Sequence, residues 1–173
     1  LAIGEPPSTK GYTPSVFALL PKLLELTGMG AKGSITALYT VLVDGGDMDE
    51  PIADAVRGIL DGHIVMDRKI ASSNIYPAID VLASASRVMG AVASPDHKKW
   101  AAQVKEWMAL YRQVEDLLNL GAYSKGSNPK IDTAIAVHGR IEALLRQGVE
   151  EEGSLDATLA QLHSVIRAAE SNS

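Results

Sequence analysis

The sequence predicts two structural regions, an α/β region over residues 1–93 followed by an all-α region over residues 94–173. Three observations lead to this prediction. Apolar residues between positions 14 and 28 recur every three or four residues, as they do on one face of a helix. The run Ile35–Val43 is rich in β-branched residues and apolar on both alternating faces, which is typical of a strand in a parallel sheet between helices. The second region shows helical spacing throughout.

The first region is predicted to begin with a helix and to continue with a mixture of strands and helices. Thr13 suits the N-cap of the first helix, Pro14 suits its first position, and Gly28 suits its end. We expect, in order, a helix at 14–28, a strand at 35–43, a helix at 52–60, a strand at 63–66 and an extended segment at 75–82.

The second region is predicted to contain three helices, each with a recognisable start. Ser94 before Pro95 and Asn128 before Pro129 are capping residues followed by a first-turn proline, and Ser154 caps the last helix. Glycines end the first two helices. Three antiparallel helices joined by short loops form a small bundle.

A glycine-rich segment, Gly28–Gly33, matches the pattern G-x-G-x-x-G of dinucleotide-binding proteins. In that motif the glycines follow a strand and open a helix whose N-terminus meets the pyrophosphate. Here the segment ends a helix and leads into a strand, so it predicts a plain turn. The phosphate-loop pattern G-x-x-x-x-G-K-[ST] occurs nowhere in the chain.

Composition argues against several classes of function. With 16 basic and 21 acidic residues the net charge is −5, which argues against nucleic-acid binding. The absence of cysteine excludes disulfides, thiolate nucleophiles and cysteine-based zinc sites. No apolar run approaches the ~20 residues of a transmembrane helix, so no transmembrane segment is expected.

The potential metal ligands predict no metal site. The four histidines are scattered and form no i, i+4 pair. Asp44, Asp47, Asp49 and Glu50 gather in one segment, but their spacing does not match a calcium-binding loop. We expect this segment to be a solvated acidic loop.

Two residues near the end of the first region leave alternatives open. Arg87 stands alone after an apolar run, so it either forms a surface ion pair or offers its planar guanidinium to a phosphate. Tyr76 precedes Pro77 and is either a packed hinge residue or a platform for stacking. Composition and spacing do not decide between these alternatives.

A series of sequence blocks carries a family resemblance from residue 1 to about residue 165. The blocks are Gly4–Pro7, Lys10–Phe17, Gly33–Val43, Asp47–Asp54, Ile59–Val65, Tyr76–Asp80, Ser86–Met89 and Gly121–Ser127. In this order they resemble the flagellar protein-export ATPases, also called flagellum-specific ATP synthases. Virulence type III secretion ATPases share most of the blocks and are the alternative, while the opening Ala2–Pro7 favours the flagellar branch.

The resemblance implies a fold related to the subunits of rotary ATP synthases. Such proteins carry a β-barrel, a RecA-like nucleotide-binding domain and a C-terminal helical domain, and they assemble as a homohexamer. On this basis residues 1–93 are the C-terminal part of the RecA-like (rotary ATPase-like) domain and residues 94–173 are the helical bundle. Since the chain opens at Leu1 without a methionine, we expect it to be a piece of a longer protein.

The resemblance also implies an activity, the hydrolysis of ATP with magnesium to energise bacterial flagellar (type III) protein export. The family's phosphate loop, magnesium-binding aspartate and catalytic glutamate lie upstream of the blocks matched here. Because phosphoryl transfer depends mostly on positioning and charge stabilisation, this polypeptide alone is expected to be inactive and to bind neither ATP nor magnesium.

Three residues are assigned to the nucleotide site by the resemblance. Arg87 matches the arginine finger that acts in trans on the neighbouring subunit's nucleotide, and Tyr76 matches the aromatic that stacks on adenine. Leu144 stands at about the position where rotary relatives carry a phenylalanine, which would make that wall of the adenine pocket aliphatic.

The loop at 121–132 corresponds by position to the acidic loop that contacts the stalk in rotary ATPases. Tyr123, Lys125 and Lys130 are the candidate partner-binding residues, although two lysines and a single acid reverse the charge of that loop. A solvated connection between helices is the alternative.

The implied partners are further copies of the chain, the stalk and regulator proteins of the export apparatus, and export chaperone–substrate complexes. The implied location is the cytoplasm, peripherally at the membrane export gate. The alternative function is a binding module without chemistry of its own, whose helical half docks export chaperones or the stalk protein.

Overall fold

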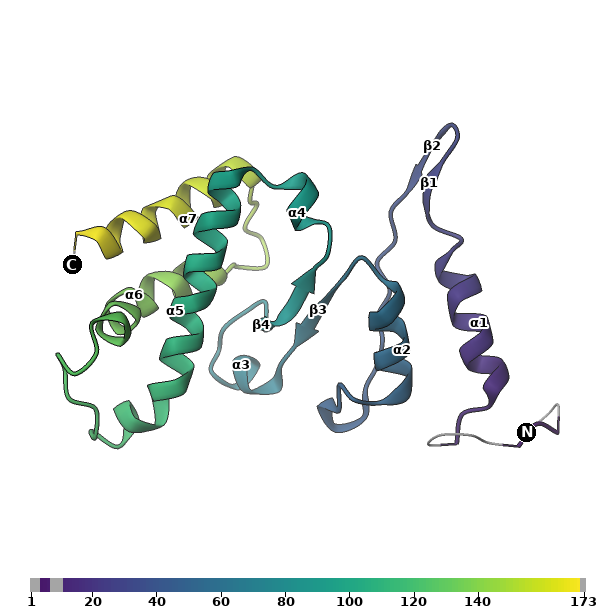
Figure 1. Cartoon of the computed structure of the whole chain (residues 1–173), viewed down its shortest axis with the longest axis horizontal. Helices are drawn as coiled ribbons and strands as arrows, with labels where there is room; N and C mark the ends of the chain where they lie inside the picture. The colour runs from purple at the N-terminus through teal and green to yellow at the C-terminus, as the bar shows by residue number, and fades with distance from the viewer. Residues whose placement is uncertain (1–3, 7–10, 172–173) are drawn as a thin grey trace. The chain divides into compact units, whose positions relative to one another are not determined.

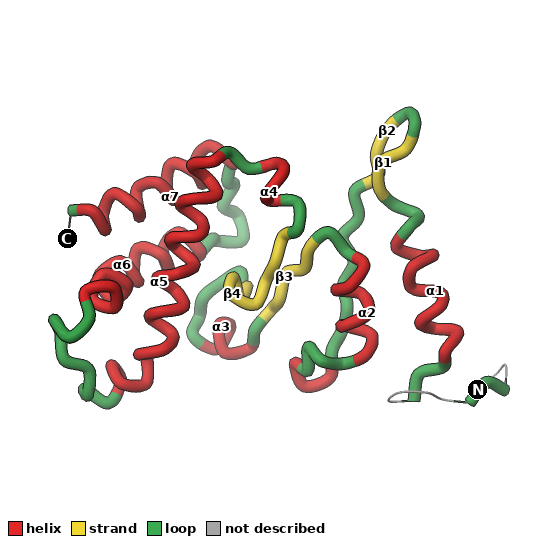
Figure 2. Tube along the Cα trace, viewed as in Figure 1, coloured by secondary structure: helices red, strands yellow, loops and turns green. Residues whose placement is uncertain are grey.

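The structure is a computed structural model that describes residues 4–6 and 11–171 of the chain. It divides into two compact units, residues 1–63 and residues 64–173. Figures 1 and 2 show the helices and strands of each unit. The division at residue 63 differs from the domain boundary at residues 93/94, which stays a prediction.

The first unit opens with the predicted helix, α1 (Pro14–Leu24), which ends earlier than Gly28. The Thr27 hydroxyl donates a hydrogen bond of 3.0 Å to the carbonyl of Leu24, so a carbonyl left at the end of the helix is satisfied. Thr13 has an extended backbone at the N-cap, but its hydroxyl lies 2.9 Å from that of Ser15 and caps no amide.

The glycine-rich segment forms a hairpin, which confirms the predicted turn. Strands β1 (Gly28–Gly30) and β2 (Gly33–Ile35) pair antiparallel, with Gly30 opposite Gly33. The hairpin reverses the chain after α1 and opens no helix, so the geometry needed to bind a pyrophosphate is missing here.

The predicted strand at 35–43 is wrong beyond Ile35. Residues 36–43 form no regular secondary structure, and the side chains of Leu38 and Leu42 are 93% and 90% exposed. A strand exists only where a neighbour accepts and donates its backbone hydrogen bonds, and no strand among the described residues pairs with this segment. Both sheets of the described chain have two strands, and no larger parallel sheet is seen there.

The acidic loop is only partly solvated, which corrects the prediction for Glu50. After the short 3-10 helix η1 (Asp44–Gly46), Glu50 lies buried at the start of α2 (Pro51–Ile59). Its carboxylate accepts a hydrogen bond of 2.8 Å from the Tyr12 hydroxyl. Pro51 at the first helical position agrees with the predicted helix.

A second pair of strands leads into the helical region. Strand β3 (Gly62–Met66) confirms the prediction at 63–66 and pairs with β4 (Ile79–Ser86). The extended segment expected at 75–82 becomes a strand only from Ile79, after Pro77, which has no N–H to donate. Two short helices were not predicted, α3 (Arg68–Ser72) and α4 (Met89–Val92).

The three long helices agree closely with the prediction. They are α5 (Pro95–Asn119), α6 (Pro129–Leu145) and α7 (Leu155–Glu170). Each predicted N-cap is confirmed, because the side chains of Ser94, Asn128 and Ser154 accept hydrogen bonds from amides of the first helical turn.

The core of the second unit lies between these helices. Val137 and Ile141 of α6 are 0% and 1% exposed, and Trp107 of α5 packs into the same cluster. The Trp100 ring stacks on His163 with centroids 4.5 Å apart, which joins α5 to α7. Among the helices described, none has the length and apolar character that a membrane crossing would require.

Candidate functional site

Strand β4 lies between the two strongest sequence candidates. Tyr76 precedes its first residue by three positions, and Arg87 follows its last residue, Ser86. An eight-residue strand spans roughly 23 Å, because each residue advances the chain by about 3.3 Å. The aromatic ring and the guanidinium therefore belong to opposite ends of one strand.

Both candidates are accessible to a ligand. Tyr76 is 52% exposed, so it is not the packed hinge residue of the alternative interpretation. Its backbone carbonyl accepts a hydrogen bond of 2.8 Å from the Gln147 amide, which lies just beyond the end of α6. Arg87 is exposed in the turn between β4 and α4.

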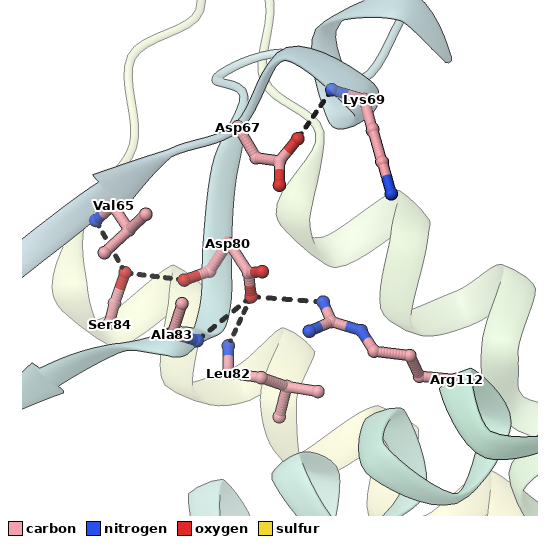
Figure 3. Close-up of polar contacts among 8 residues, drawn as sticks. All are labelled: Val65, Asp67, Lys69, Asp80, Leu82, Ala83, Ser84 and Arg112. Atoms are coloured by element: carbon pink, nitrogen blue, oxygen red, sulfur yellow. Dashed lines mark hydrogen bonds and ion pairs between the residues drawn. The ribbon is translucent and has the colours of Figure 1, made fainter. Parts of the chain in front are cut away.

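A buried carboxylate that the sequence analysis did not single out lies within β4 (Figure 3). Asp80 is 8% exposed, and its Oδ1 accepts hydrogen bonds from the amides of Leu82 (2.9 Å) and Ala83 (3.0 Å). The same oxygen lies 3.1 Å from Nη2 of Arg112, which belongs to α5. Its sequence signal is that it is the single charged residue in a strand whose other members are apolar residues and two serines.

Ser84 completes this network and joins the two strands. Its hydroxyl donates to the Asp80 carbonyl over 2.6 Å and accepts from the Val65 amide over 2.9 Å. Because Val65 belongs to β3, the network ties β4 to its neighbouring strand as well as to α5 (Figure 3).

The surroundings of Asp80 favour its charged form. Burial by itself raises the pKa of this carboxyl, but the hydrogen bond from Arg112, the amides of Ala83 and Leu82 and the charge of Arg112 outweigh it. The net pKa of Asp80 lies below its ordinary value of 3.8. At neutral pH the contact with Arg112 is therefore an ion pair.

We expect Asp80→Asn to lower the free energy of unfolding at pH 7 by about 1 kcal/mol, because a hydrogen bond to a charged group is weakened while Arg112 is half exposed. Since the pKa is lower in the folded state, this stabilisation is present above the ordinary pKa and is lost as the pH falls through the folded value. Urea titrations of both proteins between pH 7 and pH 2 measure it. The wild type should lose its advantage over the variant below about pH 4.

The control for this prediction is Asp61→Asn, because Asp61 is exposed. A difference between wild type and Asp80→Asn that stays constant down to pH 2 would contradict the role of the ion pair.

Leu144 lies on α6 and packs against the core of the helix bundle. It lines a pocket of about 280 Å³ together with residues of α7. The end of α6 does reach the backbone of Tyr76 through Gln147, three residues after Leu144. An adenine contact of Leu144 itself stays a prediction.

The loop between α5 and α6 is tied down by one carboxylate. Asp132 accepts hydrogen bonds from the Tyr123 hydroxyl (3.0 Å) and from the Gly126 amide (2.8 Å). The Tyr123 hydroxyl is thus engaged within the loop, whereas Lys125 is exposed. Lys130 lies on α6, with Nζ 3.5 Å from Oε1 of Glu106. A role of these residues in partner binding stays a prediction.

The part of the chain that the structure describes contains no group of three or more histidine, aspartate or glutamate side chains arranged to hold a metal ion. The pocket of about 550 Å³ on α6 and α7 includes none of the predicted site residues. It is lined by Arg140, Ala160, His163, Ser164, Arg167, Ala168 and Ser171.

Two family models match the chain in succession. The model of the ATP synthase alpha/beta family, nucleotide-binding domain, matches residues 1–86. The model of the type III secretion system EscN ATPase C-terminal domain matches residues 93–164.

Known proteins match the chain over almost its full length. The flagellum-specific ATP synthase of Bacillus subtilis (strain 168) is 53% identical over 165 residues, which are 95% of this chain and 38% of the relative. The assembled ATPase EscN of the enteropathogenic E. coli type III secretion system is 45% identical with a TM-score of 0.92, covering 95% of this chain and 40% of EscN. EscN in complex with its central stalk EscO has a TM-score of 0.85 at 45% identity, covering 96% and 39%. The chain thus spans well under half the length of these proteins.

Proposed function

The chain belongs to the ATPase family of flagellar and type III secretion systems, and we propose that it contributes the arginine finger and an adenine-stacking ring to a homohexameric ATPase. Hydrolysis of ATP by the complete enzyme energises flagellar protein export. The observation that carries this proposal is the placement of an exposed guanidinium and an exposed ring at opposite ends of β4. The two ends suit contacts with two different nucleotides, one in this subunit and one in its neighbour.

The residues present fit the edges of a nucleotide site. Tyr76 offers a half-exposed ring to a base, and Arg87 offers an exposed cation to a phosphate. The chain has no phosphate-loop sequence, and its described residues offer no carboxylate cluster for magnesium. Magnesium, when bound elsewhere in the enzyme, neutralises phosphate charge. The contribution of this chain is thus charge stabilisation and orientation of the base.

Arg87 has the chemistry that phosphoryl transfer requires. Its guanidinium carries a fixed charge on a planar fork that matches phosphate oxygens. An arginine supplied in trans stabilises the charge that develops on the transferring phosphoryl group. Such a residue needs a second copy of the chain beside the nucleotide, which is consistent with a homohexamer.

The helical region is the proposed docking surface for the stalk protein. EscN has been solved in complex with its central stalk, and the loop of this chain that ends at Asp132 is held in shape by two hydrogen bonds while Lys125 stays exposed. The same region is proposed to meet regulators and export chaperone–substrate complexes in the cytoplasm, at the membrane export gate. A pure binding module and a virulence counterpart remain the alternatives.

The test compares the chain with a chimeric ATPase in which it replaces the matching 165 residues of the Bacillus subtilis relative. We expect magnesium-dependent ATP hydrolysis by the chimera and none by the chain alone, because the chain lacks the phosphate loop. Phosphate release assays on both proteins measure this.

Two outcomes would contradict the proposal. Turnover by the chain alone that survives further purification would show that its own residues suffice. A folded, oligomeric chimera without turnover, combined with capture of the stalk protein by the chain, would favour the binding module.

A further inference from the structure

We infer that Asp80 and Arg112 are positioning residues for Arg87, and that their ion pair couples the helical region to the neighbouring subunit's nucleotide. The inference rests on the proposed role of Arg87. The link runs from α5 through β4, so that a change in the helix bundle reaches the guanidinium of Arg87.

A network of hydrogen bonds holds the backbone of β4 in place. Asp80 binds the backbone of Leu82 and Ala83 through one carboxylate oxygen, and Ser84 binds the Asp80 carbonyl. This network sets the backbone of the residues that lead to Arg87, three positions beyond Ser84. A displacement of Asp80 is therefore passed along the strand toward its end.

Asp80 is in turn held by an arginine of the helix bundle. The carboxylate is buried, and Arg112 reaches it from α5 with a 3.1 Å contact (Figure 3). Helix α5 is anchored in the bundle by Val104 and Trp107, which are 5% and 8% exposed and belong to its core cluster. The position of Arg112 thus follows the position of the bundle.

A further tie lies at the other end of the strand. The Gln147 amide after α6 donates to the Tyr76 carbonyl, so the approach to β4 is also held by the helical region. With contacts from both α5 and the end of α6, a shift of the bundle moves β4 along with it. The contact from α5 is made by the Arg112 side chain, so a substitution can remove it, whereas the contact after α6 is made by backbone atoms.

Removal of the ion pair need not disturb packing. Asparagine has nearly the shape of aspartate and keeps an oxygen for the Leu82 and Ala83 amides. The Arg112 side chain is 51% exposed, so methionine in its place leaves no buried cavity. Asparagine at position 80 deletes the carboxylate charge, which the lowered pKa favours at neutral pH, and methionine at position 112 deletes the opposite charge of its partner.

The experiment measures steady-state kinetics, nucleotide affinity and melting temperature of the chimeric ATPase. We expect Asp80→Asn and Arg112→Met each to lower kcat by about 10- to 100-fold with KM within about twofold, since a displacement of about 1 Å costs this much in positioned catalysis. Because both residues act through one contact, the double variant should be no slower than about the slower single variant. Arg112→Lys, which keeps the charge, should restore part of kcat.

Arg140→Met is the matched control, since Arg140 is an exposed arginine of α6 away from β4, and it should keep wild-type kinetics. Arg87→Ala distinguishes a failure of the proposed function from a failure of the positioning role of Asp80 and Arg112. If Arg87→Ala retains turnover, the proposed function is wrong. If Arg87→Ala abolishes turnover while folded Asp80→Asn and Arg112→Met keep kcat within about twofold, the positioning role is overturned. A kcat loss that only parallels a lower melting temperature and is not relieved by Arg112→Lys would also overturn it.

Discussion

Arg87→Ala in the chimeric ATPase is expected to lower kcat by about 10³-fold or more while leaving nucleotide affinity within about twofold. The reason is that an arginine finger stabilises charge that develops only in the transition state, so its loss affects the chemical step and not ground-state binding. Phosphate release kinetics and the binding of a fluorescent nucleotide analogue measure the two quantities separately. Arg87→Lys should be intermediate, because it keeps the charge but loses the planar fork.

Arg68→Ala is the matched control, since it removes another exposed arginine, on α3, and should leave turnover unchanged. Action in trans can be tested by mixing Arg87→Ala subunits with subunits whose phosphate loop is disabled. Mixed assemblies should regain activity, because some interfaces then join an intact phosphate loop to an intact Arg87. Near-normal turnover of Arg87→Ala would mean that this residue is a surface arginine without a catalytic role.

Ile141→Ala is expected to lower the free energy of unfolding by about 2–5 kcal/mol. Ile141 is 1% exposed and lies in the cluster that joins α5, α6 and α7, so the truncation leaves a cavity that the three helices cannot fill without moving. Urea denaturation of the chain, followed by circular dichroism, measures the loss. Most of the helical signal should disappear at a lower urea concentration.

Leu155→Ala is the control, because this leucine at the start of α7 is 68% exposed and should change the free energy of unfolding by less than about 0.5 kcal/mol. If the Ile141→Ala variant lost less than about 1 kcal/mol, the helix bundle would not be the stabilising core of the second unit.

The helices could be predicted because their signals are local. Ser94, Asn128 and Ser154 each cap a helix that begins at the next residue, as expected. A cap acts on amides two or three residues away, so it needs no information from the rest of the chain. The predicted strand at 35–43 failed for the opposite reason, since its backbone needs a partner strand that no local pattern supplies.

In the candidate site, too, some residues could be found from the sequence while others depended on contacts that only the fold creates. The local pattern left two alternatives open for Arg87 and Tyr76, and the resemblance to a family assigned their roles; their exposure at the ends of β4 agrees with a role in contacting a ligand. Asp80 and Arg112 were missed, because they are 32 residues apart and meet only where β4 packs beside α5.

By itself the sequence determined the helical bundle, the hairpin turn in place of a dinucleotide motif, and the family to which the chain belongs. Only the tertiary structure decided that residues 36–43 lack a partner, that Glu50 is buried against Tyr12, and that an arginine of the bundle holds the strand leading to Arg87. The physical reason is the distance along the sequence between the residues that interact. Capping and helical periodicity act between residues a turn apart, whereas strand pairing and buried ion pairs join residues that the fold alone brings together.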